Sequence, residues 1–255
     1  MKLAFIGLGV MGYPMASYLA KNHDVTVFNR TTSKAEDWCK KNEGRFVLTP
    51  AAAAENAEIV FSCVGNDDDV REILFGSNGV ISKIKKNSVI VDHTTASATI
   101  AREVSNTAIS KNVDFLDAPV SGGQAGAENG ELSVMVGGDV ATFNRVAPIM
   151  KAYSKVITHI GPVGSGQLAK MVNQICLTGV VQGLAEGLHF AEKAGLNRAV
   201  VAKAISGGAA GSWQMTNRWE TMTKNEFDFG FAVDLMRKDL SIAIEEAKKM
   251  VLTLN

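Results

Sequence analysis

The sequence has few cysteines, and they are widely spaced. Its 255 residues include only Cys39, Cys63 and Cys176, with no CxxC pair. An odd, scattered set argues against a disulfide framework, and buried reduced thiols in a cytoplasmic protein are the expectation. The four histidines also lack the spacing of metal ligands, so we expect no metal site.

The chain has no excess charge of either sign. Lysine plus arginine and aspartate plus glutamate number 26 each, and no basic block occurs. Nucleic acid and anionic membranes are therefore poor candidate partners. The apolar start, "MKLAFIGLGVMG", is interrupted by glycines, is too short to span a membrane and lacks a signal-peptide cleavage region.

What the sequence does contain is a regular alternation of short apolar runs and amphipathic stretches. The amphipathic stretches Met11–Lys21, Thr32–Lys41 and Ser97–Ser110 have helical periodicity. Strand and helix in turn predict a parallel sheet covered on both faces, and the last two runs are expected to extend or reverse it. The predicted strands are residues 2–7, 24–29, 57–63, 87–92, 113–120, 132–138 and 154–160.

The pattern changes after Ile160, where the glycine-rich segment "GPVGSG" precedes an apolar helical stretch over Ser165–Ala194. Thirty helical residues span about 45 Å, which suits a helix that connects two domains. We place the domain boundary near residue 163. Further helices are predicted over Arg198–Ser206, Ser212–Met222 and Val233–Leu252.

A nucleotide-binding motif stands at the beginning of the chain. "FIGLGVMG" has the GxGxxG spacing, follows a predicted strand and opens a predicted helix. The first glycine allows a tight turn, the second lets the backbone approach a pyrophosphate, and the third lets helix and strand pack closely. A methyltransferase that uses S-adenosylmethionine is the main competitor on this motif alone. The predicted loop comprises Gly7, Leu8, Gly9, Val10, Met11 and Gly12.

The end of the second predicted strand indicates which dinucleotide is bound. An acidic residue there would bind the ribose hydroxyls of NAD. This sequence instead has Asn29, Arg30 and Thr31, with Lys34 on the next helix and no carboxylate before Glu36. Because arginine and hydroxyl donors suit a 2′-phosphate, NADP(H) is the expected cofactor and NAD(H) the alternative.

Four motifs in this order make the chain resemble the β-hydroxyacid dehydrogenase family. They are "GLGVMG" at 7–12, "DAPVSGG" at 117–123, "GPVGSGQLAKMVN" at 161–173 and "KDL" at 238–240. The family includes 3-hydroxyisobutyrate dehydrogenase, tartronate semialdehyde reductase and glyoxylate/succinic semialdehyde reductases. The resemblance covers the whole chain. It implies an α/β Rossmann-like N-terminal domain (1–163) and an all-α C-terminal domain for substrate binding and dimerisation (164–255), joined by a long interdomain helix.

The resemblance also implies an activity and a set of site residues. The reaction is hydride transfer between nicotinamide and a short hydroxyacid or its semialdehyde, in a homodimer or homotetramer. By motif match, Lys170 and Asn173 are catalytic, and Lys238 closes the site beside the cofactor. The remaining matches are Ser121, Gly122 and Gly123 for the substrate carboxylate, and Val64, Gly65 and Thr95 for the cofactor.

This sequence departs from the family at its end. Family members usually carry further helical residues after this point, whereas this chain stops at "KKMVLTLN". We expect either a truncated chain or an abbreviated terminus, which affects the last helices and any dimer contact that they provide.

The residues themselves support these roles. A carbonyl that accepts hydride develops negative charge on oxygen, and the Lys170 ammonium can stabilise that charge and donate a proton. The Ser121 hydroxyl and the neighbouring glycine N–H groups can hold a carboxylate. Asn173, one turn after the lysine, can bond the same substrate oxygen or hold Lys170 in place. The resemblance implies that Asp239 is a structural partner, and Trp213 and Phe231 are candidate pocket walls.

Alternatives remain open at this stage. Lys170 could be a lysine that extends along the helix to water. An imine reductase-like enzyme or a non-catalytic nucleotide-binding scaffold could share the architecture, although the presence of Lys170, Asn173 and Ser121 argues against both. The leading hypothesis is an NADPH-dependent reductase of small aldehyde acids, which runs in reverse as a hydroxyacid dehydrogenase.

Overall fold

A twisted sheet forms the centre of the N-terminal part in the computed structural model, which describes residues 1–228 and 231–254. Within these residues the strand order is β3-β2-β1-β4-β5-β6-β8-β7, and β9 pairs with β8. The strands are β1 (Lys2–Ile6), β2 (Asp24–Phe28), β3 (Arg45–Phe46), β4 (Ile59–Ser62), β5 (Val89–Asp92), β6 (Asp114–Asp117), β7 (Val120–Ser121), β8 (Leu132–Gly138) and β9 (Ser154–Gly161).

Strand direction divides the sheet into two parts. Strands β1 to β6 pair in parallel, whereas β8 runs antiparallel to β6 and β7. Of the two expected alternatives, extension or reversal of the sheet, reversal occurs, at β8. The chain leaves β1 toward β2 and β3 and returns to its other side at β4, so a topological switch point lies between β1 and β4. In open α/β sheets ligands bind at such a point, beyond the carboxyl ends of the strands.

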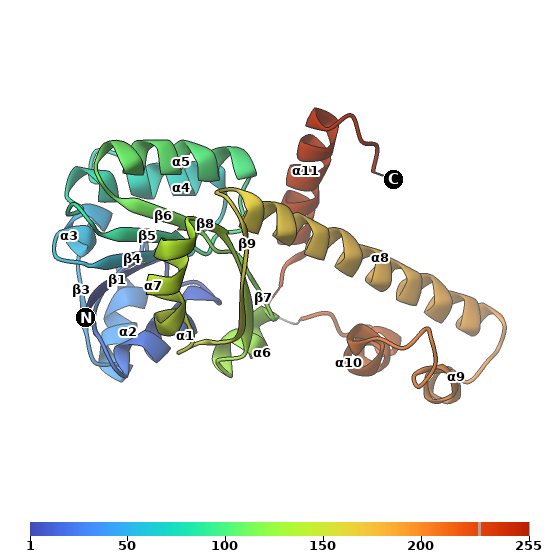
Figure 1. Ribbon diagram of the computed structural model, residues 1–255. Coiled ribbons are helices and arrows are strands. Elements are labelled where there is room, and N and C mark those ends of the chain that lie inside the picture. Colours follow the sequence, from blue (N-terminus) through green and yellow to red (C-terminus); the bar gives the residue numbers. More distant parts are fainter. Residues whose placement is uncertain (229–230, 255) are drawn as a thin grey trace.

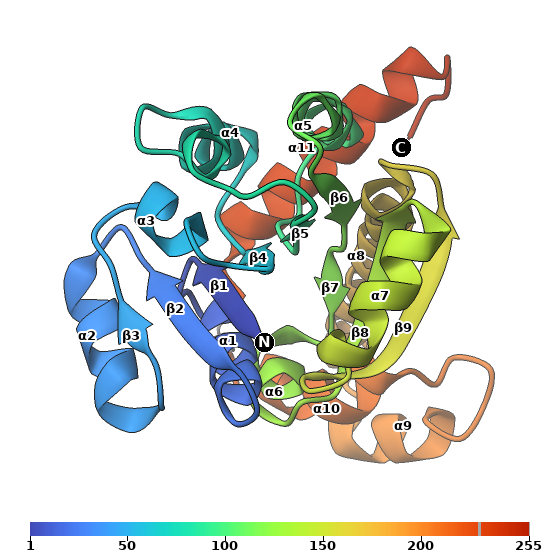
Figure 2. The same ribbon diagram turned by 60° about the vertical axis from the view of Figure 1, so that its left-hand side comes forward.

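Helices cover both faces of the sheet, as the alternation predicted (Figure 2). Leu3 and Phe5 of β1 pack in one apolar cluster with α1 and α2, and Ala4 and Ile6 pack in a second cluster with α3, α4 and α5. Successive strand residues point to opposite faces, so an unbroken apolar strand serves both clusters. The helices are α1 (Gly12–Ala20), α2 (Thr32–Lys41), α3 (Pro50–Ala54), α4 (Asp67–Phe75), α5 (Ala98–Ser110), α6 (Gly123–Glu128) and α7 (Val140–Met150).

The C-terminal part is helical, and it begins with the long helix α8 (Ser165–Lys193). Figure 1 shows α8 extending away from the sheet toward α9 (Arg198–Ile205) and α10 (Trp213–Thr223), while α11 (Val233–Lys249) returns beside its first turns. Leu184 and Leu188 of α8 pack with Met215 and Trp219 in a small separate core. No helix in the described ranges is long and apolar enough to cross a membrane.

The structure confirms the predicted fold class and corrects several details. The predicted strand over 113–120 is divided into β6 and β7 at Pro119, which has no N–H to donate. Elements β3, α3, α4, α6 and α7 were not individually predicted. The expectation that the cysteines are buried is wrong for Cys176, which is exposed, and only partly met by Cys39 and Cys63, which are half-buried; all three cysteines are free.

Candidate active site

The glycine loop between β1 and α1 has the geometry that dinucleotide binding needs. Gly7 has a φ of 97°, and a Cβ there would overlap the Cys63 carbonyl oxygen. A Cβ on Gly12 would overlap the Gly7 carbonyl oxygen, whereas a Cβ on Gly9 would have no neighbour within 4 Å. The first and third glycines thus permit the turn and its close packing, and the second leaves open space where a pyrophosphate fits.

Asn29 fixes this loop from the end of β2. Its Oδ1 accepts a hydrogen bond from the Leu8 N–H at 2.8 Å, and its Nδ2 donates to the Thr31 carbonyl at 3.0 Å. The next residue, Arg30, has a side chain that is 87% exposed and pairs with Asp69 at 3.1 Å. Asn29 therefore orders the glycine loop, and the exposed Arg30 guanidinium follows Asn29 at the end of β2.

Lys238 of α11 connects the two other predicted cofactor segments. Its Nζ donates to the Gly65 carbonyl at 2.9 Å and to the Thr95 carbonyl at 2.6 Å. In the same region the Val64 N–H donates to Thr94 Oγ1 at 3.0 Å. A residue far along the chain is thus brought to the carboxyl ends of β4 and β5, next to the switch point.

Lys170 lies in the second turn of α8 and is only 7% exposed. Burial lowers the pKa of its ammonium from 10.5 to about 8, with Lys238 adding to the decrease and Asp239 opposing it. The lysine is therefore not extended along the helix to water, which removes that alternative. It keeps its proton at neutral pH but can lose it about 300 times more readily than an exposed lysine.

A chain of hydrogen bonds that ends in an ion pair joins the other candidate residues. Ser121 Oγ donates to Asn173 Oδ1 at 3.2 Å, and Asn173 Nδ2 donates to Gln174 Oε1 at 2.8 Å. Gln174 Nε2 then donates to Asp239 Oδ2, and Asp239 Oδ1 lies 3.1 Å from Lys238 Nζ. These contacts connect β7 to α8 and α8 to α11. The structure therefore assembles Ser121, Asn173 and Lys238 in one connected set.

Two buried side chains hold the start of α8 against the sheet. Asp117, at the end of β6, accepts from the N–H groups of Gly164 at 2.7 Å and Gln167 at 2.9 Å. The Gln167 amide accepts from the Ala96 N–H and donates to the Thr94 carbonyl. Burial raises the pKa of Asp117 to about 6, opposed by its hydrogen bonds. These contacts fix the helix turn that precedes Lys170.

A second buried hydrogen-bond network lies at the end of β5, the strand next to β6, and has a structural role. His93 Nδ1 lies 2.6 Å from the Ala118 carbonyl, which can only accept, so this nitrogen carries the proton. His93 Nε2 then accepts from the Tyr153 hydroxyl at 2.8 Å. Burial lowers the pKa of His93 to about 4, which keeps the ring neutral. The ring is fully hydrogen-bonded and has no free group to offer a ligand.

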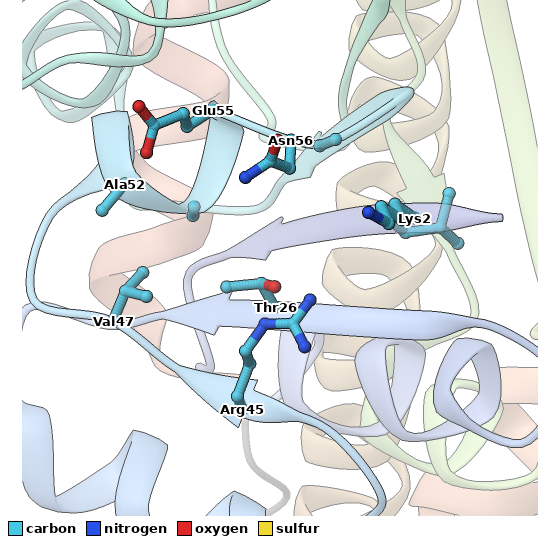
Figure 3. Close-up of a pocket in the computed structure, with 10 residues that line it drawn as sticks. Lys2, Thr26, Arg45, Val47, Ala52, Glu55 and Asn56 are labelled. Carbon is cyan, nitrogen blue, oxygen red and sulfur yellow. The ribbon is translucent and has the colours of Figure 1, made fainter.

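Surface cavities lie near the sheet at opposite ends of its strands. One of about 570 Å³ borders the glycine loop and is lined by Leu8, Gly9 and Val10 together with side chains of α1, α2 and α6. The other, of about 250 Å³, lies near the amino end of β1 between the strands and α3, among Lys2, Arg45 and Glu55 (Figure 3). The second contains none of the predicted site residues.

Sequence reasoning missed several residues of the site. Gln167 and Gln174 were detectable, because they lie at i−3 and i+4 from Lys170 and so on the same face of the predicted helix; the structure buries both. Asp69 gave no comparable signal. Trp213 and Phe231 are 61% and 48% exposed, and their role as pocket walls stays a prediction. No group of His, Cys, Asp or Glu arranged for a metal ion occurs in residues 1–228 or 231–254.

A Rossmann-like sheet with this glycine loop is typical of dinucleotide-dependent oxidoreductases. Two family descriptions match the chain: the NAD binding domain of 6-phosphogluconate dehydrogenase over residues 2–161, and the NAD-binding region of NADP-dependent 3-hydroxyisobutyrate dehydrogenase over 164–255. The chain belongs to the β-hydroxyacid dehydrogenase family. It is an NAD(P)-dependent oxidoreductase.

Individual relatives agree with this assignment. An uncharacterized oxidoreductase of Shewanella frigidimarina is 58% identical, over 97% of this chain and 86% of its own length. The 2-hydroxy-3-oxopropionate reductase of Escherichia coli is 39% identical, over 100% of this chain and 87% of its own length. Among solved structures, Mycobacterium tuberculosis 3-hydroxyisobutyrate dehydrogenase with L-serine has a TM-score of 0.88 at 31% identity, covering 99% and 88% of the two chains.

Proposed function

We propose that this protein is an NADP(H)-preferring reductase of short semialdehydes that carry a carboxylate, and that in reverse it oxidises the corresponding 3-hydroxy acids. In this proposal residues 1–163 bind the cofactor and residues 164–255 provide the substrate and dimerisation domain. The observation that carries it is the position of Lys170. A lysine that is 7% exposed, with a pKa lowered to about 8 and no structural ion pair of its own among the described residues, is suited to proton transfer.

The cofactor site is proposed to consist of four segments that follow β1, β2, β4 and β5. The loop from Gly7 to Gly12 faces the pyrophosphate, Asn29 to Thr31 the adenosine ribose, and the segments at Val64, Gly65 and Thr95 the nicotinamide half. Arg30 supports the preference for NADP(H), because an exposed guanidinium can turn to a 2′-phosphate. NAD(H) remains the secondary cofactor.

The chain's own residues would then act as follows. The bound nicotinamide supplies or accepts the hydride. The Ser121 hydroxyl, which donates to Asn173 in this structure, turns to the substrate carboxylate together with the N–H groups of Gly122 and Gly123. Those two glycines precede and begin α6, where backbone N–H groups have no partner within the helix.

Proton transfer is assigned to Lys170. Its ammonium donates to the carbonyl oxygen during reduction, and its neutral amine accepts the hydroxyl proton during oxidation. Asn173 orients the substrate oxygen toward the lysine. Lys238, held by the Gly65 and Thr95 carbonyls, closes the cleft beside the cofactor and excludes water.

Assembly and location complete the proposal. Apolar side chains are exposed along α8, with Val172 at 61%, and this supports a homodimer or homotetramer formed through the helical part. Three free cysteines support a cytoplasmic location. Small carboxylate substrates, and neither nucleic acid nor membrane, are the proposed partners, in line with the absence of net charge.

A substrate panel tests the function. Purified protein is mixed with NADPH and with glyoxylate, succinic semialdehyde, tartronate semialdehyde or methylmalonate semialdehyde, and the absorbance of the reduced nicotinamide is followed. We expect one of these acids to be reduced with a clear advantage over an uncharged aldehyde of similar size. Reduction of cyclic imines but of none of the acids would favour the imine reductase alternative, and cofactor binding without turnover of either class would favour a scaffold.

A further inference from the structure

A single carboxylate joins the two loops on either side of the glycine loop. Asp69 Oδ1 accepts from Arg30 Nη1 at 3.1 Å, and Asp69 Oδ2 accepts from the Gly65 N–H at 3.2 Å. Arg30 follows β2 and Gly65 follows β4, and both strands are neighbours of β1. The adenosine part of a dinucleotide lies across the carboxyl ends of such strands. Asp69 therefore stands where the adenosine ribose is expected.

The carboxylate of this pair is fixed, whereas the guanidinium is free to move. Asp69 lies in the first turn of α4, its own N–H donates to Asn66 Oδ1 at 2.9 Å, and its side chain is 30% exposed. The carboxylate packs so closely on Gly65 that a Cβ there would overlap it. The Arg30 side chain, by contrast, is 87% exposed. When a cofactor enters, Arg30 can turn toward it while Asp69 stays in place.

We propose that Asp69 is a cofactor-specificity residue that limits the preference for NADPH; this rests on the cofactor site proposed above. Its negative charge competes with a 2′-phosphate for Arg30 and repels that phosphate. The same carboxylate can accept a hydrogen bond from the 2′-hydroxyl of NADH. In NAD enzymes the acid with this task comes from the end of β2; here α4 supplies it, while β2 supplies the arginine.

The expected effect is moderate because the site is open to water. A single charge a few ångströms from a phosphate dianion changes its affinity by roughly three- to tenfold at the dielectric constant of water. Salt reduces the effect, so measurements belong at low ionic strength. Asp69 should thus change the preference between NADPH and NADH, measured as the ratio of kcat/KM, without preventing either cofactor from binding.

Asp69→Asn is the informative variant, because its amide oxygen can still accept from the Gly65 N–H while the charge is removed. The matched control is Asp68→Asn, since Asp68 is 92% exposed and pairs with Arg71 instead. Two quantities are measured for each: kcat/KM with NADPH and with NADH on the same carbonyl substrate, and competitive inhibition by adenosine 2′,5′-bisphosphate and by AMP.

We expect Asp69→Asn to raise the NADPH to NADH ratio of kcat/KM by about three- to tenfold and to tighten the bisphosphate inhibitor similarly. AMP should not bind more tightly, and Asp68→Asn should leave the ratio nearly unchanged. If Asp69→Asn alters both cofactors equally, the carboxylate only braces the loop and the proposal is wrong. If Asp69→Asn is unstable, Asp69→Ser, which also removes the charge, is measured in the same assays and interpreted in the same way.

Failure of this inference is distinguishable from failure of the proposed cofactor preference. A wild-type enzyme that favours NADH, with a ratio unaffected by Arg30→Ala, would contradict the NADP(H) preference. The NADPH to NADH ratio of kcat/KM for Asp69→Asn is compared with that of the wild type. An unchanged ratio overturns the inference whichever cofactor the wild type prefers.

Discussion

Replacing Lys170 by methionine separates the chemical step from folding and cofactor binding. Methionine keeps the length of the side chain and the helix propensity but removes the charge. The lysine acts on charge that develops only as the hydride moves, so its loss should reduce kcat and leave the affinity for NADPH nearly intact. Positioned acid–base groups contribute about 10²–10⁴-fold, roughly 3–5 kcal/mol of barrier. We expect kcat to fall by at least about a hundredfold.

The same variant should be at least as stable as the wild type. Burial lowers the pKa of Lys170 from 10.5 to about 8, so the charged form is less stable in the folded protein than in water by roughly 3 kcal/mol. This destabilisation is fully present below pH 8 and fades as the pH rises from about 8 toward 10.5. Removing the charge at pH 7 should therefore raise Tm, with a ceiling of about 10 °C for a chain of this size.

Steady-state kinetics, NADPH titration and thermal melting of the variant test these expectations together. Lys193→Met is the control, because it makes the same change on the same helix at an exposed position, and it should match the wild type in all three assays. A Lys170→Met protein that turns over at close to the wild-type kcat would refute the proposed proton donor. A variant with a markedly lower Tm would show that the lysine is a structural residue and that the stability reasoning is wrong.

Three further predictions follow from the site. Arg30→Asp should reverse or abolish the preference for NADPH, by roughly tenfold or more in the kcat/KM ratio; an unchanged ratio would show that Arg30 does not contact the phosphate. Ser121→Ala should raise KM for the semialdehyde acid by roughly tenfold with a smaller effect on kcat, whereas equal losses with an uncharged aldehyde would contradict a carboxylate site. The apparent pKa of Lys170 is near 8, so kcat for reduction should fall as the pH rises through about 8 and kcat for oxidation should fall as the pH drops through it. Wild-type profiles that lack this opposite dependence, or Lys170→Met profiles that keep it, would assign the titration to another group.

Much of the fold could be predicted because it depends on local pattern. Helices α2 and α5 begin and end within a residue of their predicted limits, because an amphipathic period specifies both locally and the Ser97 side chain caps α5. The start of α8 was predicted at Ser165 for a similar reason, since flexible glycines precede an unbroken helical stretch. The short helices α3 and α6 were not predicted, since five or six residues carry too little periodicity to be recognised.

The sequence by itself also determined the chemical types of the site residues and the glycine positions, because a positive φ at Gly7 and a close approach at Gly12 are requirements of the local backbone. Only the tertiary structure decided which distant groups meet. Lys238 reaches Gly65 and Thr95 because α11 folds back across the strand ends. The low pKa of Lys170 and the pairing of Arg30 with Asp69 likewise depend on burial and on distances between elements far apart in the chain, and neither quantity is a property of local sequence.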